Sequence, residues 1–101
     1  MTPSPNPDYD VPISGAVREL LLRLHDEATA DGRPSEFLAA LRSISQRLRT
    51  EPVTFGEEVF DLRALRLTVK VAVVLPVAVE FGVYAERRAV FIRTFRSVPP
   101  G

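Results

Sequence analysis

The stretch from residue 65 to residue 97, LRLTVKVAVVLPVAVEFGVYAERRAVFIRTFRS, decides the fold class. Apolar and polar side chains alternate along it in three runs, which is the period of a β-strand with one buried face. Short breaks around Pro76 and Glu86 separate the runs. The stretch therefore predicts three strands that follow one another as an antiparallel meander, and residues 59–62 form a weaker strand candidate before it.

Two helical patterns precede the meander, at residues 14–30 and 35–50. Ser14 is a typical N-cap for the first helix, and Pro34 blocks its continuation. The connection between the helices is so short that they must form a near-antiparallel hairpin. Residues 9–14 alternate like an edge strand ahead of the first helix. The element order predicts an α+β fold with an N-terminal strand, a two-helix hairpin and an antiparallel β-meander, the helices packing on one face of a four- or five-stranded sheet.

The spacing of the breaks predicts how the strands pair. A three-residue loop at 74–76 pairs Lys70 with Glu80, and a turn at 86–87 pairs Glu80 with Arg93. Both registers place the β-branched aliphatic side chains beneath the helices. The predicted core comprises Val69, Val71, Val79, Phe81 and Ile92 from the strands and Leu21, Leu24, Phe37, Leu41 and Ile44 from the helices.

The same pairing predicts a face away from the helices that carries aromatic rings beside charged side chains. Its predicted members are Arg66, Lys70, Glu80, Tyr84, Phe91, Arg93 and Phe95. Three interpretations are open. The face can be a solvated ladder of ion pairs with rings covering small neighbours, a surface that binds phosphate or carboxylate with stacking positions, or a protein-docking surface.

Amino-acid composition limits the number of domains, the binding partners and the kinds of site that this chain can have. A chain of 101 residues with 46% apolar content predicts one domain, at residues 9–98, between a Pro-rich disordered tail at 1–8 and a short tail at 99–101. Thirteen basic residues balance thirteen acidic ones, so no net field attracts nucleic acid or an anionic membrane. The chain has one His and no Cys, and the absence of Cys excludes disulfides and Cys-ligated zinc. We expect no metal and no cofactor.

Charged residues and a proline interrupt the apolar run 65–85, so it does not predict a membrane span. The N-terminal residues lack the apolar core of a signal peptide. These two features predict a cytoplasmic protein.

The segment YDVPIS at 9–14, leading into the first helix, resembles the opening of the RelE/ParE toxin superfamily. FLAALRSISQRLRTEPVTFGEEVFDL at 37–62 and LPVAVEFGVYAERRAVFIRTF at 75–95 carry the rest of the likeness, which runs from residue 9 to residue 98. The chain looks like a diverged, plasmid-stabilisation-like member. The resemblance implies a strand, a helical hairpin and a meander, and it implies ribosome-dependent mRNA cleavage or gyrase inhibition, restrained by a cognate antitoxin.

The chain departs from the cleaving members at two places. Ala78 stands where those members carry an Arg, and residues 95–101 replace their usual Gly-His-Arg or Tyr-bearing tail. The remaining candidates for a catalytic role are Lys70, Tyr84, Arg93 and Arg96.

We therefore expect a bacterial toxin-like component of a type II toxin–antitoxin system that acts by binding a cellular target, with weak or no nuclease activity. One alternative is a non-catalytic interaction domain that retains only the scaffold, and another is a ribosome-dependent mRNA interferase. The expected partners are an antitoxin or a second copy of the chain. The neutral net charge does not favour RNA, the ribosome or gyrase.

Overall fold

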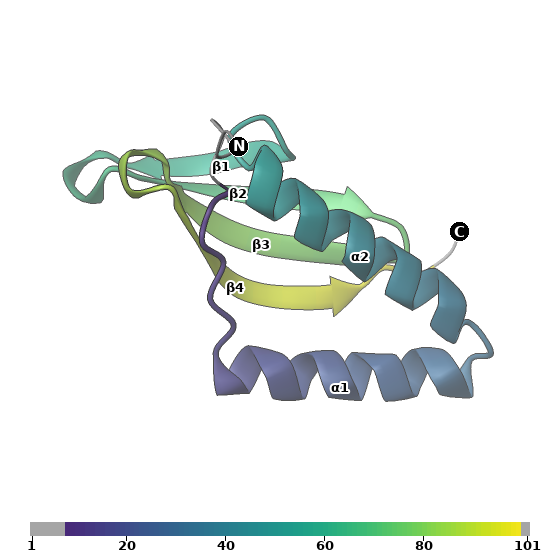
Figure 1. Cartoon of the computed structure of the whole chain (residues 1–101). Coiled ribbons are helices and arrows are strands. Elements are labelled where there is room, and N and C mark those ends of the chain that lie inside the picture. The colour runs from purple at the N-terminus through teal and green to yellow at the C-terminus, as the bar shows by residue number, and fades with distance from the viewer. Residues whose placement is uncertain (1–7, 100–101) are drawn as a thin grey trace, which may run out of the picture.

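The computed structural model describes residues 8–99, so the predicted tails at 1–8 and 99–101 lie almost wholly outside it. Its elements confirm the α+β class (Figure 1). In chain order they are α1 (Gly15–Ala30), α2 (Pro34–Thr50), β1 (Glu57–Leu62), β2 (Leu67–Val74), β3 (Val77–Tyr84) and β4 (Ala89–Ser97). Two 3-10 turns, Arg63–Leu65 and Ala85–Arg87, connect β1 to β2 and β3 to β4.

Local signals set the helix ends. The Ser14 side chain accepts a hydrogen bond from the Val17 backbone N–H (3.1 Å), as the sequence predicts for an N-cap. After α1 the chain turns through Gly32, whose φ of 74° suits glycine. Pro34 then occupies the first turn of α2, where its missing N–H costs nothing.

The four strands pair antiparallel in the order β1-β2-β3-β4, and the helices lie on one face of the sheet (Figure 1). Helix α1 packs against β4, while α2 crosses β2 and β3. No helix covers β1, and all six of its residues are exposed. The helices therefore cover one face of β2, β3 and β4. The opposite face of the sheet is uncovered along all four strands.

The core forms where the two helices meet the central strand β3. The largest fully buried side chains include Phe37, Ile44, Leu48, Val79 and Phe81. The Phe55 ring, from the segment after α2, stacks on Phe81 with centroids 5.8 Å apart. The predicted helix residues thus contribute as expected, with Leu21 and Leu41 partly buried at the margin.

The predicted N-terminal strand at 9–14 is wrong. Asp10 makes only an isolated parallel bridge with Ala89. Its N–H donates to the Arg88 carbonyl, and its own carbonyl accepts from the Val90 N–H, each at 2.8 Å. Pairing stops there because Pro12 has no N–H to donate and the chain then enters the α1 cap.

The predicted pairing of β2 with β3 is also wrong, by one residue. Val74 remains in the ladder and pairs with Val77, so the connection is the dipeptide Leu75-Pro76 instead of a three-residue loop. Lys70 consequently pairs with Phe81 and not with Glu80. Because neighbouring side chains point to opposite faces, this slip reverses the whole strand. Val69 and Val71 move to the face away from the helices, where Val69 is nevertheless only 3% exposed, and Thr68, Lys70, Ala72 and Val74 face the helices instead.

The pairing of β3 with β4 is as predicted up to a bulge. Val83 pairs with Val90 and Phe81 with Ile92, but Arg93 is an extra residue in β4. Beyond the bulge Phe95 pairs with Val79 and points into the core, where it is 5% exposed. Phe95 therefore does not belong to the uncovered face, because an inserted residue changes which side the following residues occupy.

Candidate functional site: the open face of the sheet

The side of the sheet away from the helices forms one continuous surface, which we call the open face. Strand register and the two bulges determine its members. They are Glu57, Phe60 and Leu62 from β1, Leu67, Val69, Val71 and Val73 from β2, Ala78, Glu80, Gly82 and Tyr84 from β3, and Phe91, Arg93, Thr94 and Arg96 from β4.

Large apolar side chains on the open face remain in contact with solvent. Phe60 is 43% exposed, Phe91 48% and Val73 55%, and Val59 and Leu62 on β1 are exposed as well. Scattered single apolar residues are normal on protein surfaces, whereas a contiguous apolar patch marks an interaction site. The open face has the composition of such a site.

A shallow hollow of about 180 Å³ lies within the open face. Its lining consists of Leu67, Val69, Gly82, Tyr84, Phe91 and Arg93. The Tyr84 and Phe91 rings meet edge to face, with centroids 5.3 Å apart. A Cβ on Gly82 would lie 2.7 Å from Leu67 Cδ1, so the glycine allows Leu67 to lie across the sheet. The result is an apolar depression with an aromatic wall and one cation.

The charged side chains of the open face are Glu57 on β1, Glu80 on β3 and Arg93 and Arg96 on β4. Arg93 forms an ion pair with Glu80, as the sequence predicts, although Glu80 pairs with Thr94 in the backbone ladder. Glu57 on β1 and Arg96 on β4 form no ion pair within residues 8–99. The open face thus carries an unpaired anion on one outer strand and an unpaired cation on the other.

Lys70 is not on the open face, contrary to the sequence prediction. It lies on the helix side of β2 and is 6% exposed. Its ammonium donates a hydrogen bond to the Val53 carbonyl. Burial lowers the pKa of Lys70 from its usual 10.5, and the negative charge of Glu58 opposes part of that change.

Arg66 lies at the end of the sheet instead of on its face. It follows the first 3-10 turn with a φ of 54° and forms an ion pair with Glu86 in the equivalent turn between β3 and β4. Arg88 follows that second turn with a φ of 50°. The ion pair therefore joins the two hairpin connections.

The four candidate catalytic residues do not converge on one point. Tyr84 and Arg93 line the same hollow, while Lys70 lies on the other side of the sheet. Arg96 lies further along β4, opposite Ala78. Among the described residues no group of acidic or His side chains could hold a metal ion. This arrangement therefore favours a binding surface over an active site, because an active site needs a general acid and a general base around one substrate atom.

Sequence reasoning missed the contribution of β1. The alternation of Phe60 and Leu62 within EEVFDL indicates a strand. Three acidic residues in the same segment lower its strand propensity and weaken that indication. The one-residue register error places three β2 residues on the helix side in the sequence prediction, although they lie on the open face: Val69, Val71 and Val73. Together these residues make the open face more apolar than predicted.

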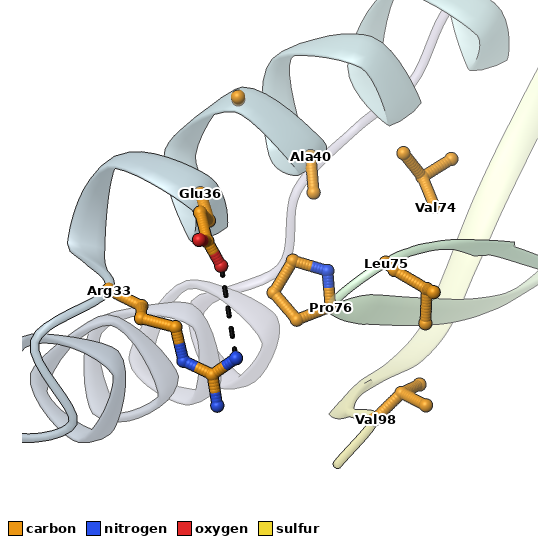
Figure 2. Close-up of a pocket in the computed structure, with 8 residues that line it drawn as sticks. Arg33, Glu36, Ala40, Val74, Leu75, Pro76 and Val98 are labelled. Carbon is orange, nitrogen blue, oxygen red and sulfur yellow. Dashed lines mark ion pairs between the residues drawn. The ribbon is translucent and has the colours of Figure 1, made fainter. Parts of the chain in front are cut away.

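A second concavity lies where the α1–α2 turn meets the connection between β2 and β3 (Figure 2). It encloses about 470 Å³, and Ala40, Val74, Leu75, Pro76 and Val98 provide apolar walls. At one side Arg33 Nη1 lies 3.9 Å from Glu36 Oε1, so the two charged groups of its lining pair with each other. This cavity offers apolar shape without polar groups free to orient a ligand.

No helix within residues 8–99 is long and apolar enough to cross a membrane. Comparison with known proteins gives no match: no family model, no curated protein and no solved structure matches the chain significantly.

Proposed function

We propose that this chain is a toxin-like, protein-binding domain that acts through the open face of its sheet and not by catalysis. The observation that carries the proposal is the apolar surface around Phe60, Val73 and Phe91, which the helices leave exposed. Aromatic and Arg side chains around a shallow hollow are the usual composition of an interface centre. The separation of Lys70 from Tyr84 and Arg93 supports binding over catalysis.

The toxin-like part of the proposal rests on the resemblance to the RelE/ParE superfamily. A helical hairpin followed by an antiparallel meander is part of the order that this resemblance implies, whereas the opening strand that it also implies is reduced to the single bridge at Asp10. The proposed role is a component of a type II toxin–antitoxin system that binds a cellular target and is restrained by a protein partner. The alternative, an interaction domain that has kept only the scaffold, uses the same face without harming the cell.

Growth after induced expression tests this proposal. We expect wild-type chain to slow growth, and the double variant Phe60→Ser, Phe91→Ser to lose that effect. The double variant Leu22→Ser, Leu38→Ser is the matched control, because both leucines are exposed on the helices. It should remain toxic. Growth arrest that survives the open-face variant contradicts the role of this face, and a harmless wild type at full expression favours the scaffold-only alternative.

We also expect purified chain to leave mRNA intact on translating ribosomes. Primer extension on a translated message measures this directly. Cleavage that disappears in Tyr84→Phe or Arg93→Ala, the two candidates that share the hollow, would instead establish the interferase alternative.

A further inference from the structure

We propose that the partner of the open face is a second copy of this chain, and that the two sheets stack face to face about a twofold axis parallel to the strands. This inference rests on the proposed function, since it names a partner of the same surface, one that the cellular target has to displace in order to bind. Under that rotation the open face is complementary to itself in charge and in shape.

A twofold axis places the same patch of both subunits in contact, so the patch must be complementary to itself. An axis running between β2 and β3 lays β1 of one copy over β4 of the other, and β2 over β3. Positions along the strands are kept. Two aligned sheets pack in this way about 10 Å apart, with their strands at about 30°. The two outer strands must therefore complement each other in charge and in shape.

The charges satisfy this condition. One level of the open face runs through Glu57, Val71, Glu80 and Thr94, and Arg96 stands one level further along β4. The rotation brings Glu57 of each copy over the Thr94 level of the other, one step from Arg96. Within one chain the two residues lie three strand spacings apart, roughly 14 Å, which is too far for an ion pair. Their charges complement each other only between copies.

The apolar side chains of the two outer strands also complement each other between copies. A second level runs through Phe60, Val69, Gly82 and Phe91. The rotation places Phe60 of one copy over Phe91 of the other, at the hollow that Tyr84 and Phe91 border. An aromatic ring seated in such a depression is the usual anchor of an interface. Both exposed Phe residues are covered by the same contact.

The surface is large enough for a moderate dimer. Four strands of about eight residues present roughly 19 Å by 26 Å, or about 500 Å² per partner, which is at the lower end of the area that specific interfaces bury. The outer edge of β1 is a poorer site for a second copy. Its acidic residues Glu57, Glu58 and Asp61 would bring like charges together if two β1 strands paired.

Charge reversal tests the inference. We expect light scattering to show that wild-type chain dimerises with concentration. Glu57→Arg alone and Arg96→Glu alone should each weaken dimerisation by about tenfold or more, since each places like charges together. The variant carrying both changes should dimerise like wild type. An equimolar mixture of the two single variants should form a heterodimer, because each then presents the charge that the other needs.

The control is Glu19→Arg with Arg42→Glu, two exposed helix positions away from the open face, which should change nothing. Circular dichroism establishes that each variant is folded. A chain that stays monomeric, or a dimer indifferent to both reversals, overturns the inference. The proposed function fails separately, if the open-face variant Phe60→Ser, Phe91→Ser still arrests growth. A monomer whose toxicity depends on the open face would therefore mean that a different protein occupies it.

Discussion

At the scale of single residues, Lys70 is unusual because its cation is buried between the sheet and the segment after α2 that contains Val53. Within residues 8–99 its ammonium donates a hydrogen bond to a single backbone carbonyl, that of Val53. Since burial lowers its pKa below 10.5, the unfolded chain holds this proton more tightly than the folded chain. The charged form therefore costs stability, and the cost disappears as the pH rises through the folded pKa towards 10.5.

We predict that Lys70→Met raises the free energy of unfolding at neutral pH by up to about 1 kcal/mol, because it removes a buried charge and keeps the length of the side chain. The advantage over wild type should shrink as the pH approaches 10.5. Urea titrations at several pH values measure both effects. Lys70→Arg is the control, since Arg stays charged and should lack the alkaline gain. A less stable Met variant at every pH would mean that the bond to Val53 outweighs the burial cost.

Phe81 and Phe91 give a matched pair of aromatic residues on opposite faces of the sheet. Phe81 is fully buried on the helix side, whereas Phe91 is half exposed on the open face. We predict that Phe81→Ala costs about 3–5 kcal/mol of unfolding free energy. Phe91→Ala should cost less than about 2 kcal/mol, since half of its ring is already in water. Equal losses in denaturant titrations of the monomer would contradict the face assignment.

At the scale of elements, the helices could be predicted closely and the strand registers could not. A helix carries its own boundary signals, such as the Ser14 cap and Pro34, within a few residues of its ends. A strand register depends on the length of a loop, and Val74 is equally plausible as loop or ladder from the sequence. A one-residue error leaves the alternation intact while it reverses every side chain. The bulge at Arg93 has the same effect on Phe95.

The two helix starts differ in a way that can be measured. Ser14 accepts a hydrogen bond from the first turn of α1, while the residue that caps α2 is Arg33, without a side-chain bond. We predict that Ser14→Ala lowers stability by about 1 kcal/mol. Ser35→Ala, a serine in the first turn of α2 that is not its cap, should stay within about 0.5 kcal/mol of wild type. Thermal unfolding measures both, and equal losses would remove the capping explanation.

At the scale of the whole molecule, the existence of an open face could be predicted, but only part of its membership. Glu80, Tyr84, Phe91 and Arg93 lie there as expected. Arg66, Lys70 and Phe95 do not, and β1 supplies residues that its acidic sequence concealed. The element order determines that one side of the sheet is uncovered. Which side chains point to that side depends on long-range pairing, which local patterns do not report.

The uneven helix cover predicts a gradient of local stability across the sheet. Strand β3 lies inside the sheet and most of its residues are buried, whereas β1 lies outside the helices, is exposed throughout and has one free edge. We expect β3 amides to exchange with solvent only on global unfolding and β1 amides to exchange through local opening. Hydrogen exchange followed by NMR measures this. Protection of the β1 amides that equals that of β3 would mean that another strand pairs with the β1 edge.

The backbone bonds that Asp10 makes to β4 also bear on the solubility of the protein. Exposed strand edges can template endless addition of further chains, the route to fibres. Here the N-terminal segment occupies the start of the β4 edge, and Glu57, Glu58 and Asp61 give the β1 edge a negative charge. Polymer growth is discouraged at both ends of the sheet. An assembly of this chain should therefore close after a fixed number of copies instead of elongating, even at the high concentrations of overexpression.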